Sequence, residues 1–315
     1  MNDQNAKKMG LQSVSKGKLD EPIRAVIWGP AGLGKSTFAS QAPSPIFLPT
    51  EDGTAQLDVA RFPRPESLAD CIEAVRTLTD EAHEYQTLVV DTLTHMEPLV
   101  WRSAIDANNR TTKGAKATNI DEVRGGFGKG YDAAVDEWRL FLAALERLRA
   151  KKRMHVVLIG HATVKNFKNP EGPDFERYEL QLEKKAAGLF REWVDAYLFA
   201  TYEAYADKDD KTKKAKGIST GARIVRTNWT AAYDAKNRYA LPDPMPLAWA
   251  DFYAATRKAA PADPAALLAA IDDKLAGLSE ADQKTATDAK GRAAGDPVKL
   301  AQLNNWLNAK LAATR

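Results

Sequence analysis

The sequence predicts an α/β fold in which a mainly parallel central sheet is flanked by helices, with a small helical unit at the C-terminus. Short apolar runs alternate with amphipathic helical periodicities, a pattern typical of strands that are buried on both faces of a sheet. After Arg257 the composition shifts to alanine-rich segments in which Trp306 is the only aromatic residue. These observations divide the chain into an N-terminal arm (1–22), a core (23–257) and a C-terminal helical tail (258–315).

The expected elements follow in chain order. Helical periodicity is expected from Leu68 to Leu78 and from Tyr131 to Leu148, and in the tail from Leu267 to Leu278 and from Leu300 to Leu311. Asp296 and Pro297 provide an N-cap and a first-turn proline for the last of these helices. The runs that predict strands are 23–28, 45–49, 87–91, 155–160 and 194–200.

Three polar segments interrupt this pattern. Residues 106–130 and 163–178 have no apolar period, and we expect both to be long loops, which are usually either functional or disordered. The charge run at 207–217 predicts a solvated hairpin turn.

Composition limits the classes of protein to consider. The chain has 315 residues, of which 44% are hydrophobic, so it can bury a sizeable core and is neither disordered nor fibrous. Its 45 basic and 42 acidic residues give a net charge of +3, so any DNA-binding surface must be local. Cys71 is the only cysteine, which excludes an intrachain disulfide and favours a reducing compartment. With no long apolar stretch, we expect a cytoplasmic protein without a membrane partner.

A phosphate-binding motif lies between the first expected strand and a helix. The segment fits G-x-x-x-x-G-K-[ST], whose backbone N–H groups and helix N-terminus hold phosphate. Lys35 is expected to reach the β- and γ-phosphates, and the Ser36 hydroxyl to bind Mg²⁺. The sequence therefore predicts ATP and Mg²⁺ as cofactors. The nucleotide-binding residues would be Gly29, Pro30, Ala31, Gly32, Leu33, Gly34, Lys35, Ser36 and Thr37.

The third expected strand ends in an acidic residue that completes this site. Asp91 follows Thr87 to Val90 and is expected to hold the water shell of Mg²⁺. Thr92 comes next, where many ATPases place a glutamate. The catalytic base must therefore come from another part of the chain.

With these motifs the chain resembles the RecA-type recombination ATPases, and more narrowly the RecA-like phage nucleotide-binding proteins that include single-strand annealing proteins of the Sak class. The resemblance covers roughly residues 10–257. In that family the base is a glutamate after the strand that follows the phosphate-loop helix, which matches Glu51 here. The neighbouring Asp52 is a rival for this role.

The resemblance implies two further catalytic positions. His161 ends the fourth core strand, where recombinases typically carry a glutamine that senses the γ-phosphate. Lys236 and Arg238 lie in a segment similar to the recombinase segment that reaches the ATP of a neighbouring subunit, so one of them would act as a trans finger.

The two long loops occupy the positions where the family binds single-stranded DNA. Basic side chains there would follow the phosphate backbone, and aromatic rings would stack on bases. The first loop offers Arg110, Lys113, Lys116, Arg124, Phe127, Lys129 and Tyr131, and the second offers Lys165, Phe167, Lys168, Phe175 and Arg177.

The remaining histidines, the cysteine and four of the tryptophans are not assigned to a site. His83, His95 and His155 are on different elements and form no metal-binding spacing. Cys71 lies on the apolar side of its expected helix. The tryptophans Trp101, Trp138, Trp193 and Trp249 fit helical or strand periodicities, as core residues do.

The leading hypothesis is an ATP-dependent, single-stranded-DNA-binding recombinase or annealing protein of phage type. It would be a homo-oligomer, ring or filament, with ATP at subunit interfaces, and residues 10–22 would add a strand to a neighbour. The tail would recruit a single-strand-binding protein. A hexameric helicase or motor, a small-molecule kinase and a nucleotide-gated adaptor remain as alternatives.

Overall fold

The structure is a computed structural model that describes residues 10–17, 19–170, 172–208, 215–257, 264–275, 277–293, 299–300, 303–304 and 306–307. Among these residues no helix combines the length and apolarity needed to cross a bilayer. The helix start expected at Asp296 and Pro297 lies outside the described residues.

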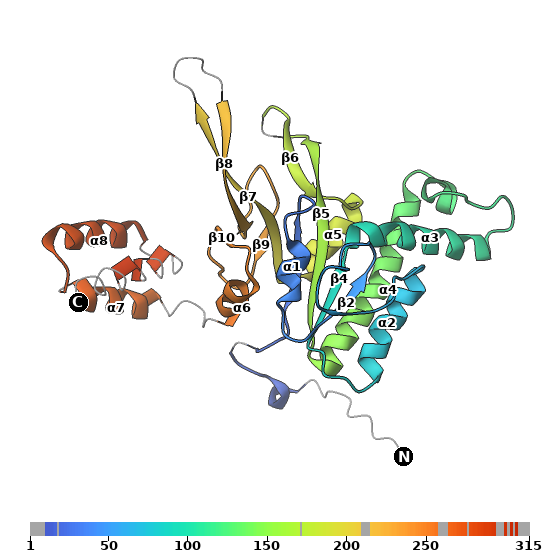
Figure 1. The fold of residues 1–315 in the computed structure, drawn as a ribbon, viewed down its shortest axis with the longest axis horizontal. Coiled ribbons are helices and arrows are strands. Elements are labelled where there is room, and N and C mark those ends of the chain that lie inside the picture. The colour runs from blue at the N-terminus through green and yellow to red at the C-terminus, as the bar shows by residue number, and fades with distance from the viewer. Residues whose placement is uncertain are drawn as a thin grey trace.

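A mainly parallel sheet forms the centre of the molecule (Figure 1). The order of its described strands is β10-β8-β7-β1-β5-β4-β2-β3. The pairs β1–β5, β1–β7, β4–β5, β2–β4 and β2–β3 are all parallel, which confirms the predicted fold class. The first four strands in chain order are β1 (Arg24–Gly29), β2 (Pro45–Pro49), β3 (Ala60–Arg61) and β4 (Thr87–Asp91).

Antiparallel strands extend this sheet at two places. In Figure 1 the β5–β6 and β7–β8 hairpins project from the same end of the molecule. The prediction of a long loop at 163–178 is therefore wrong, because residues 163–167 continue β5 and β6 begins at Phe175. The strands are β5 (His155–Phe167), β6 (Phe175–Leu180), β7 (Ala196–Lys208), β8 (Ala215–Arg226), β9 (Lys236–Asn237) and β10 (Met245–Pro246).

Helices cover both faces of the sheet. One core contains buried residues of α2, α3, α4 and α5, and the other contains buried residues of α1 and α6. The bounds are α1 (Lys35–Ser40), α2 (Leu68–Asp80), α3 (Leu93–Thr111), α4 (Lys129–Lys152), α5 (Lys184–Trp193) and α6 (Trp249–Arg257).

Alternation along β1 assigns its side chains to the two cores. Val26 and Trp28 pack in the core with α2 to α5, whereas Ala25 and Ile27 pack in the core with α1 and α6. All four are almost fully buried, and a fully buried large apolar side chain contributes roughly 1.5–3 kcal/mol. Burial on both faces explains why β1 reads as a continuous apolar run.

The segment expected as a loop at 106–130 is largely ordered. Helix α3 continues to Thr111, and a 3-10 helix, η2 (Ile120–Gly125), follows. Ala117, Ile120 and Val123 are buried in the core that contains α2 to α5. Three isolated apolar residues form no helical period, so the sequence did not predict this burial.

The two ends of the chain differ from the core. Leu11 and Val14 are 92% and 71% exposed, and the described residues before β1 include a 3-10 helix, η1 (Leu11–Ser13), but no strand. In the tail, α7 (Pro264–Leu275) and α8 (Glu280–Ala293) contribute to a separate cluster that includes Ile271, Ala286 and Leu300. The division at residue 257 stays a prediction.

Candidate active site

The phosphate-binding motif forms the turn between β1 and α1. A side chain at Gly29 would collide with the sheet, because its Cβ would lie 2.1 Å from the carbonyl oxygen of Ala200. Gly34 has φ 99°, a left-handed conformation that favours glycine, at the residue before α1 begins. The loop thus has the backbone freedom that phosphate binding by N–H groups requires.

Lys35 is held inside this loop. Its side-chain ammonium donates to the carbonyl oxygens of Gly29, at 3.0 Å, and Pro30, at 2.7 Å. Burial lowers the pKa of Lys35 to about 8, although the nearby carboxylates of Asp91 and Glu51 oppose the shift. A phosphate group would replace the weak carbonyl partners with a full negative charge.

Asp91 ends β4 and is 0% exposed. Burial raises its pKa, and the nearby Ser36 hydroxyl partly offsets the rise. Neither carboxylate oxygen has a hydrogen-bond partner of normal geometry among the described residues. A buried carboxylate without a partner is costly unless a cation or a polar ligand compensates it. Asp91 and Ser36 therefore fit Mg²⁺, which prefers hard oxygen ligands.

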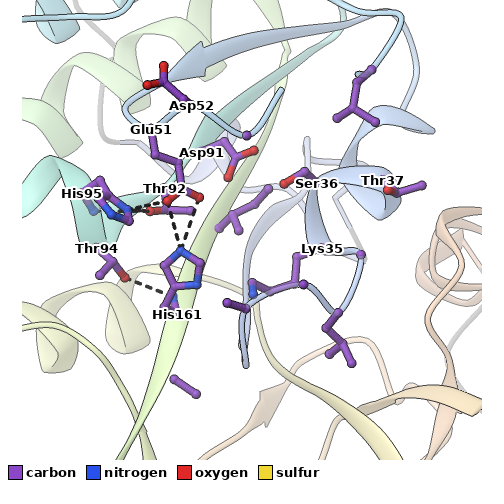
Figure 2. Close-up of a pocket in the computed structure, with 18 of the residues that line it drawn as sticks. Lys35, Ser36, Thr37, Glu51, Asp52, Asp91, Thr92, Thr94, His95 and His161 are labelled. Carbon is purple, nitrogen blue, oxygen red and sulfur yellow. Dashed lines mark hydrogen bonds and ion pairs between the residues drawn. The ribbon is translucent and has the colours of Figure 1, made fainter. Parts of the chain in front are cut away.

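Glu51 lies between two histidines (Figure 2). Its Oε2 is 2.6 Å from His95 Nδ1, and both of its carboxylate oxygens are 3.3 Å from His161 Nε2. Ligand atoms of the three residues lie within 4.8 Å of one another. This cluster fixes the Glu51 carboxylate beside Asp91 and the phosphate loop.

Each histidine is placed by its own element. His95 lies in the first turn of α3, where its backbone N–H donates to the capping hydroxyl of Thr92. The backbone N–H of His161, on β5, donates to Thr94 Oγ1 at 3.0 Å. The sequence spacing predicted no metal-binding group at His95, whereas the fold brings His95 together with Glu51 and His161. The position of His95 four residues after Asp91 was the available signal.

Asp52 faces away from this cluster in Figure 2. Its side chain is 90% exposed and forms an ion pair with Arg64 at 3.1 Å. Of the two candidate bases, Glu51 is therefore the one oriented toward the phosphate loop.

A single cavity of about 800 Å³ joins these groups. This volume is within the usual range for small-molecule sites, and its lining mixes backbone amides with charged side chains. The lining includes residues 31–37 of the phosphate loop together with Glu51, Asp52, Asp91, His95 and His161.

Arg223, on β8, is a further charged group at the loop that the sequence did not reveal. A Cβ placed on Gly34 would lie 2.9 Å from Arg223 Nη1. Arg223 is exposed, and its guanidinium has no hydrogen-bond or ion-pair partner within the described part of the chain. Only the pairing of β8 with β7, through Tyr202, brings this distant residue to the phosphate loop.

Lys236 and Arg238 lie away from the cavity, beside the amino-terminal end of β7. The Lys236 ammonium donates to the carbonyl oxygens of Arg191, Glu192 and Val194 at the end of α5. These bonds use its three N–H groups, so the structure gives Lys236 a capping role instead of the free cation that a trans finger needs. Arg238 is half exposed and pairs with Asp195 at 2.9 Å, and its trans role stays a prediction.

The basic residues expected to bind DNA fall into two groups. On the β5–β6 hairpin, Lys165 and Lys168 lie 3.8 and 2.5 Å from Glu179 and Asp174, so their charge is partly neutralised. Phe167 is covered on one face by the Arg177 guanidinium, whose centre lies 5.2 Å from the ring centroid.

The other group surrounds η2. Phe127 is 99% exposed, and Arg110, Lys113 and Lys129 are also exposed. Lys116 instead donates to the carbonyls of Asn109 and Thr112, and Arg124 pairs with Asp136. The Phe127 ring and the cations of Arg110, Lys113 and Lys129 are therefore accessible to a ligand.

Comparison with known families places the site within a matched domain. A family model described as "AAA domain" matches residues 21–239, which include the whole cavity lining described above. A comparison with curated protein sequences finds no match.

Two solved structures show weak similarity. The RadB recombinase is 14% identical with a TM-score of 0.35, and the match covers 65% of this chain and 87% of that chain. The flagellar accessory protein FlaH from Methanocaldococcus jannaschii is 12% identical with a TM-score of 0.31, and the match covers 65% of this chain and 86% of that chain.

Proposed function

The chain belongs to the AAA domain family, as a P-loop ATPase, and from this premise we propose that it is a single-stranded-DNA-dependent recombinase or annealing protein of the RecA-like phage type. The ATPase assignment depends on the Glu51 carboxylate, which two histidines hold beside the phosphate loop. It also depends on the buried Asp91 carboxylate, which lacks a hydrogen-bond partner of normal geometry among the described residues.

The residues divide the chemistry of hydrolysis among them. Lys35 and the loop amides bind the triphosphate, and Ser36 with Asp91 would hold Mg²⁺, which supplies charge neutralisation when bound. Glu51 accepts a proton from the attacking water as the new bond to the γ-phosphorus forms and the bond to ADP breaks. His95 and His161 keep the Glu51 carboxylate in position.

The DNA assignment rests on exposed charge and one exposed ring around η2, and on the hairpin that continues from His161. Phe127, Lys113 and Lys129 are available on one segment, and the β5–β6 hairpin follows His161 directly in sequence. Basic surfaces with exposed aromatic residues bind single strands without sequence preference. The exposed Leu11 and Val14 of the N-terminal arm support self-association, since a neighbouring subunit would bury them.

The test is ATP hydrolysis with and without single-stranded DNA, at about 50 and about 200 mM salt. We expect DNA to stimulate turnover severalfold at low salt and less at high salt, with Lys35→Ala as the inactive reference. Lys113→Ala combined with Lys129→Ala should reduce the stimulation, whereas Arg76→Ala, on the exposed side of α2, should not. Hydrolysis that is indifferent to DNA would contradict the proposal and favour a kinase or an adaptor.

A further inference from the structure

A second cavity, of about 670 Å³, adjoins the nucleotide cavity. Thr94 and Gln181 line both cavities, so the two are neighbours around the backbone of His161. The nucleotide site described above does not use the remaining lining of the second cavity. That lining includes Glu97, Trp101, Tyr131, Thr163, Lys165 and Lys184.

The walls of the second cavity come from the two segments proposed to bind DNA, the segment that joins α3 to α4 and the β5–β6 hairpin. Lys165 belongs to the β5–β6 hairpin, and Tyr131 lies in the first turn of α4, directly after Phe127 and Lys129. Glu97 and Trp101 come from α3, which connects Asp91 to the first segment. A strand that contacted both segments would therefore pass over the opening between them.

Aromatic side chains give this cavity a surface suited to a flat ring. Trp101 and Tyr131 are half-buried, and their rings meet edge to face with centroids 5.9 Å apart. Trp101 Nε1 is buried without a hydrogen-bond partner among the described residues. A nucleobase offers a flat face that stacks on rings placed in this way.

Polar groups in the second cavity match the edge of a base and its phosphate. Glu97 is 8% exposed, and its Oε1 accepts the backbone N–H of Glu183 at 2.8 Å. Burial raises the pKa of Glu97 to about 7, so the carboxyl can serve as a donor or an acceptor. Lys184 is exposed and has no ion-pair partner in the described part of the chain, which leaves a cation for a phosphate.

We propose that the second cavity binds one unstacked nucleobase of single-stranded DNA, with the base against Trp101 and Tyr131 and its phosphate near Lys184. The proposal rests on the proposed function, since it names where that DNA would contact the protein.

The same cavity provides a route from DNA to hydrolysis. Thr94 Oγ1 accepts the backbone N–H of His161 at 3.0 Å, and the backbone N–H of Gln181 donates to the carbonyl of His161 at 2.9 Å. A base that contacts Thr94 or Gln181 would therefore affect the position of His161, whose ring contacts the Glu51 carboxylate. Occupancy of the second cavity would position the catalytic carboxylate.

The first experiment compares two oligonucleotides of equal length and charge, one of thymidines and one in which the bases are absent. Stacking of a base on an aromatic side chain is worth roughly 1–3 kcal/mol, so wild type should prefer the thymidine strand by about fivefold to about a hundredfold. Trp101→Ala should lose most of this preference, and Trp101→Phe, which keeps a ring, should retain part of it. Trp229→Ala removes an exposed tryptophan elsewhere and serves as the matched control.

A second experiment needs no variant. Oligonucleotides that carry 5-iododeoxyuridine crosslink on irradiation to aromatic residues in contact with the base, and peptide mass spectrometry locates the crosslink. We expect Trp101 or Tyr131.

The outcomes separate the two proposals. If the protein binds neither oligonucleotide, the proposed function itself fails. If it binds both equally, or crosslinks only through Phe127 or Phe167, then DNA binding stands and the base cavity is overturned. Transfer of the γ-phosphate to a free nucleoside would assign the second cavity to a small phosphoryl acceptor and also overturn the proposal.

Discussion

Glu51 and Asp52 are adjacent carboxylates with opposite surroundings. The Glu51 carboxylate faces the phosphate loop between two histidines, whereas the Asp52 carboxylate is 90% exposed and paired with Arg64. Sequence alone left both as candidates for the base, because consecutive residues after a strand can point in different directions.

We therefore expect Glu51→Gln to bind ATP while turnover falls by about 10²–10⁴, the usual contribution of a general base. Asp52→Asn is the matched control and should hydrolyse ATP at close to the wild-type rate. Nucleotide binding is measured by calorimetry and turnover by phosphate release. The reverse result, with Asp52→Asn inactive and Glu51→Gln active, would transfer the role to Asp52.

Glu97 predicts a dependence of stability on pH. Burial raises its pKa from 4.5 to about 7 in the folded protein, so the folded state binds this proton more tightly than the unfolded chain. The free energy of unfolding is therefore expected to fall as pH rises from about 4.5 to about 7, with a loss of up to about 3 kcal/mol.

Glu97→Gln cannot ionise and keeps an oxygen for the Glu183 N–H. This variant should be more stable than wild type at pH 8 and should lose most of that advantage at pH 5. Urea unfolding at both pH values measures the difference, and Glu179→Gln, on β6, is the control. An advantage of equal size at the two pH values would rule out ionisation as its cause.

Helix α5 is capped at its C-terminal end by Lys236, a residue that the sequence analysis had assigned to a trans finger. Glu183 caps its N-terminus by accepting the N–H groups of Lys185 and Ala186, and Lys236 caps its C-terminus from a distant strand. The motif Ala-Lys-Asn-Arg revealed a basic segment, but only the pairing of β9 with β7 determines that Lys236 meets a helix end.

Lys236→Ala should therefore lower the free energy of unfolding by about 1 kcal/mol and leave turnover at saturating ATP nearly unchanged. Thermal unfolding and steady-state hydrolysis are measured on the same preparation, with Lys236→Arg as the conservative comparison. A large loss of turnover without loss of stability would restore the trans role to Lys236.

At the scale of the whole molecule, the question is whether hydrolysis needs a neighbour. The N-terminal arm exposes Leu11 and Val14, and Arg238 lies half exposed beside the amino-terminal end of β7, away from the cavity of its own chain. An arginine so placed acts on ATP only if another subunit brings its phosphate loop to that edge.

If Arg238 acts in trans, mixing inactive Lys35→Ala subunits with inactive Arg238→Ala subunits should restore part of the hydrolysis, because some interfaces then hold one intact loop and one intact finger. Each variant alone, at the same total concentration, is the reference. No recovery at any mixing ratio would reject the trans assignment.

The sequence by itself determined the parallel sheet and the loop that binds phosphate. Buried strands such as Thr87–Asp91 are continuous apolar runs, and the phosphate loop is a contiguous motif whose glycines and lysine act through local backbone geometry. Such features are encoded by neighbours in the chain and are therefore visible in it.

Only the tertiary structure decided which distant side chains meet. It brought His95 to Glu51, placed Arg223 against Gly34, and folded residues 117–123 into the core. It also converted a supposed loop into the β5–β6 hairpin and joined that hairpin to α4 around a second cavity. The physical reason is that strand pairing and helix packing connect residues far apart in sequence, and no local period records those contacts.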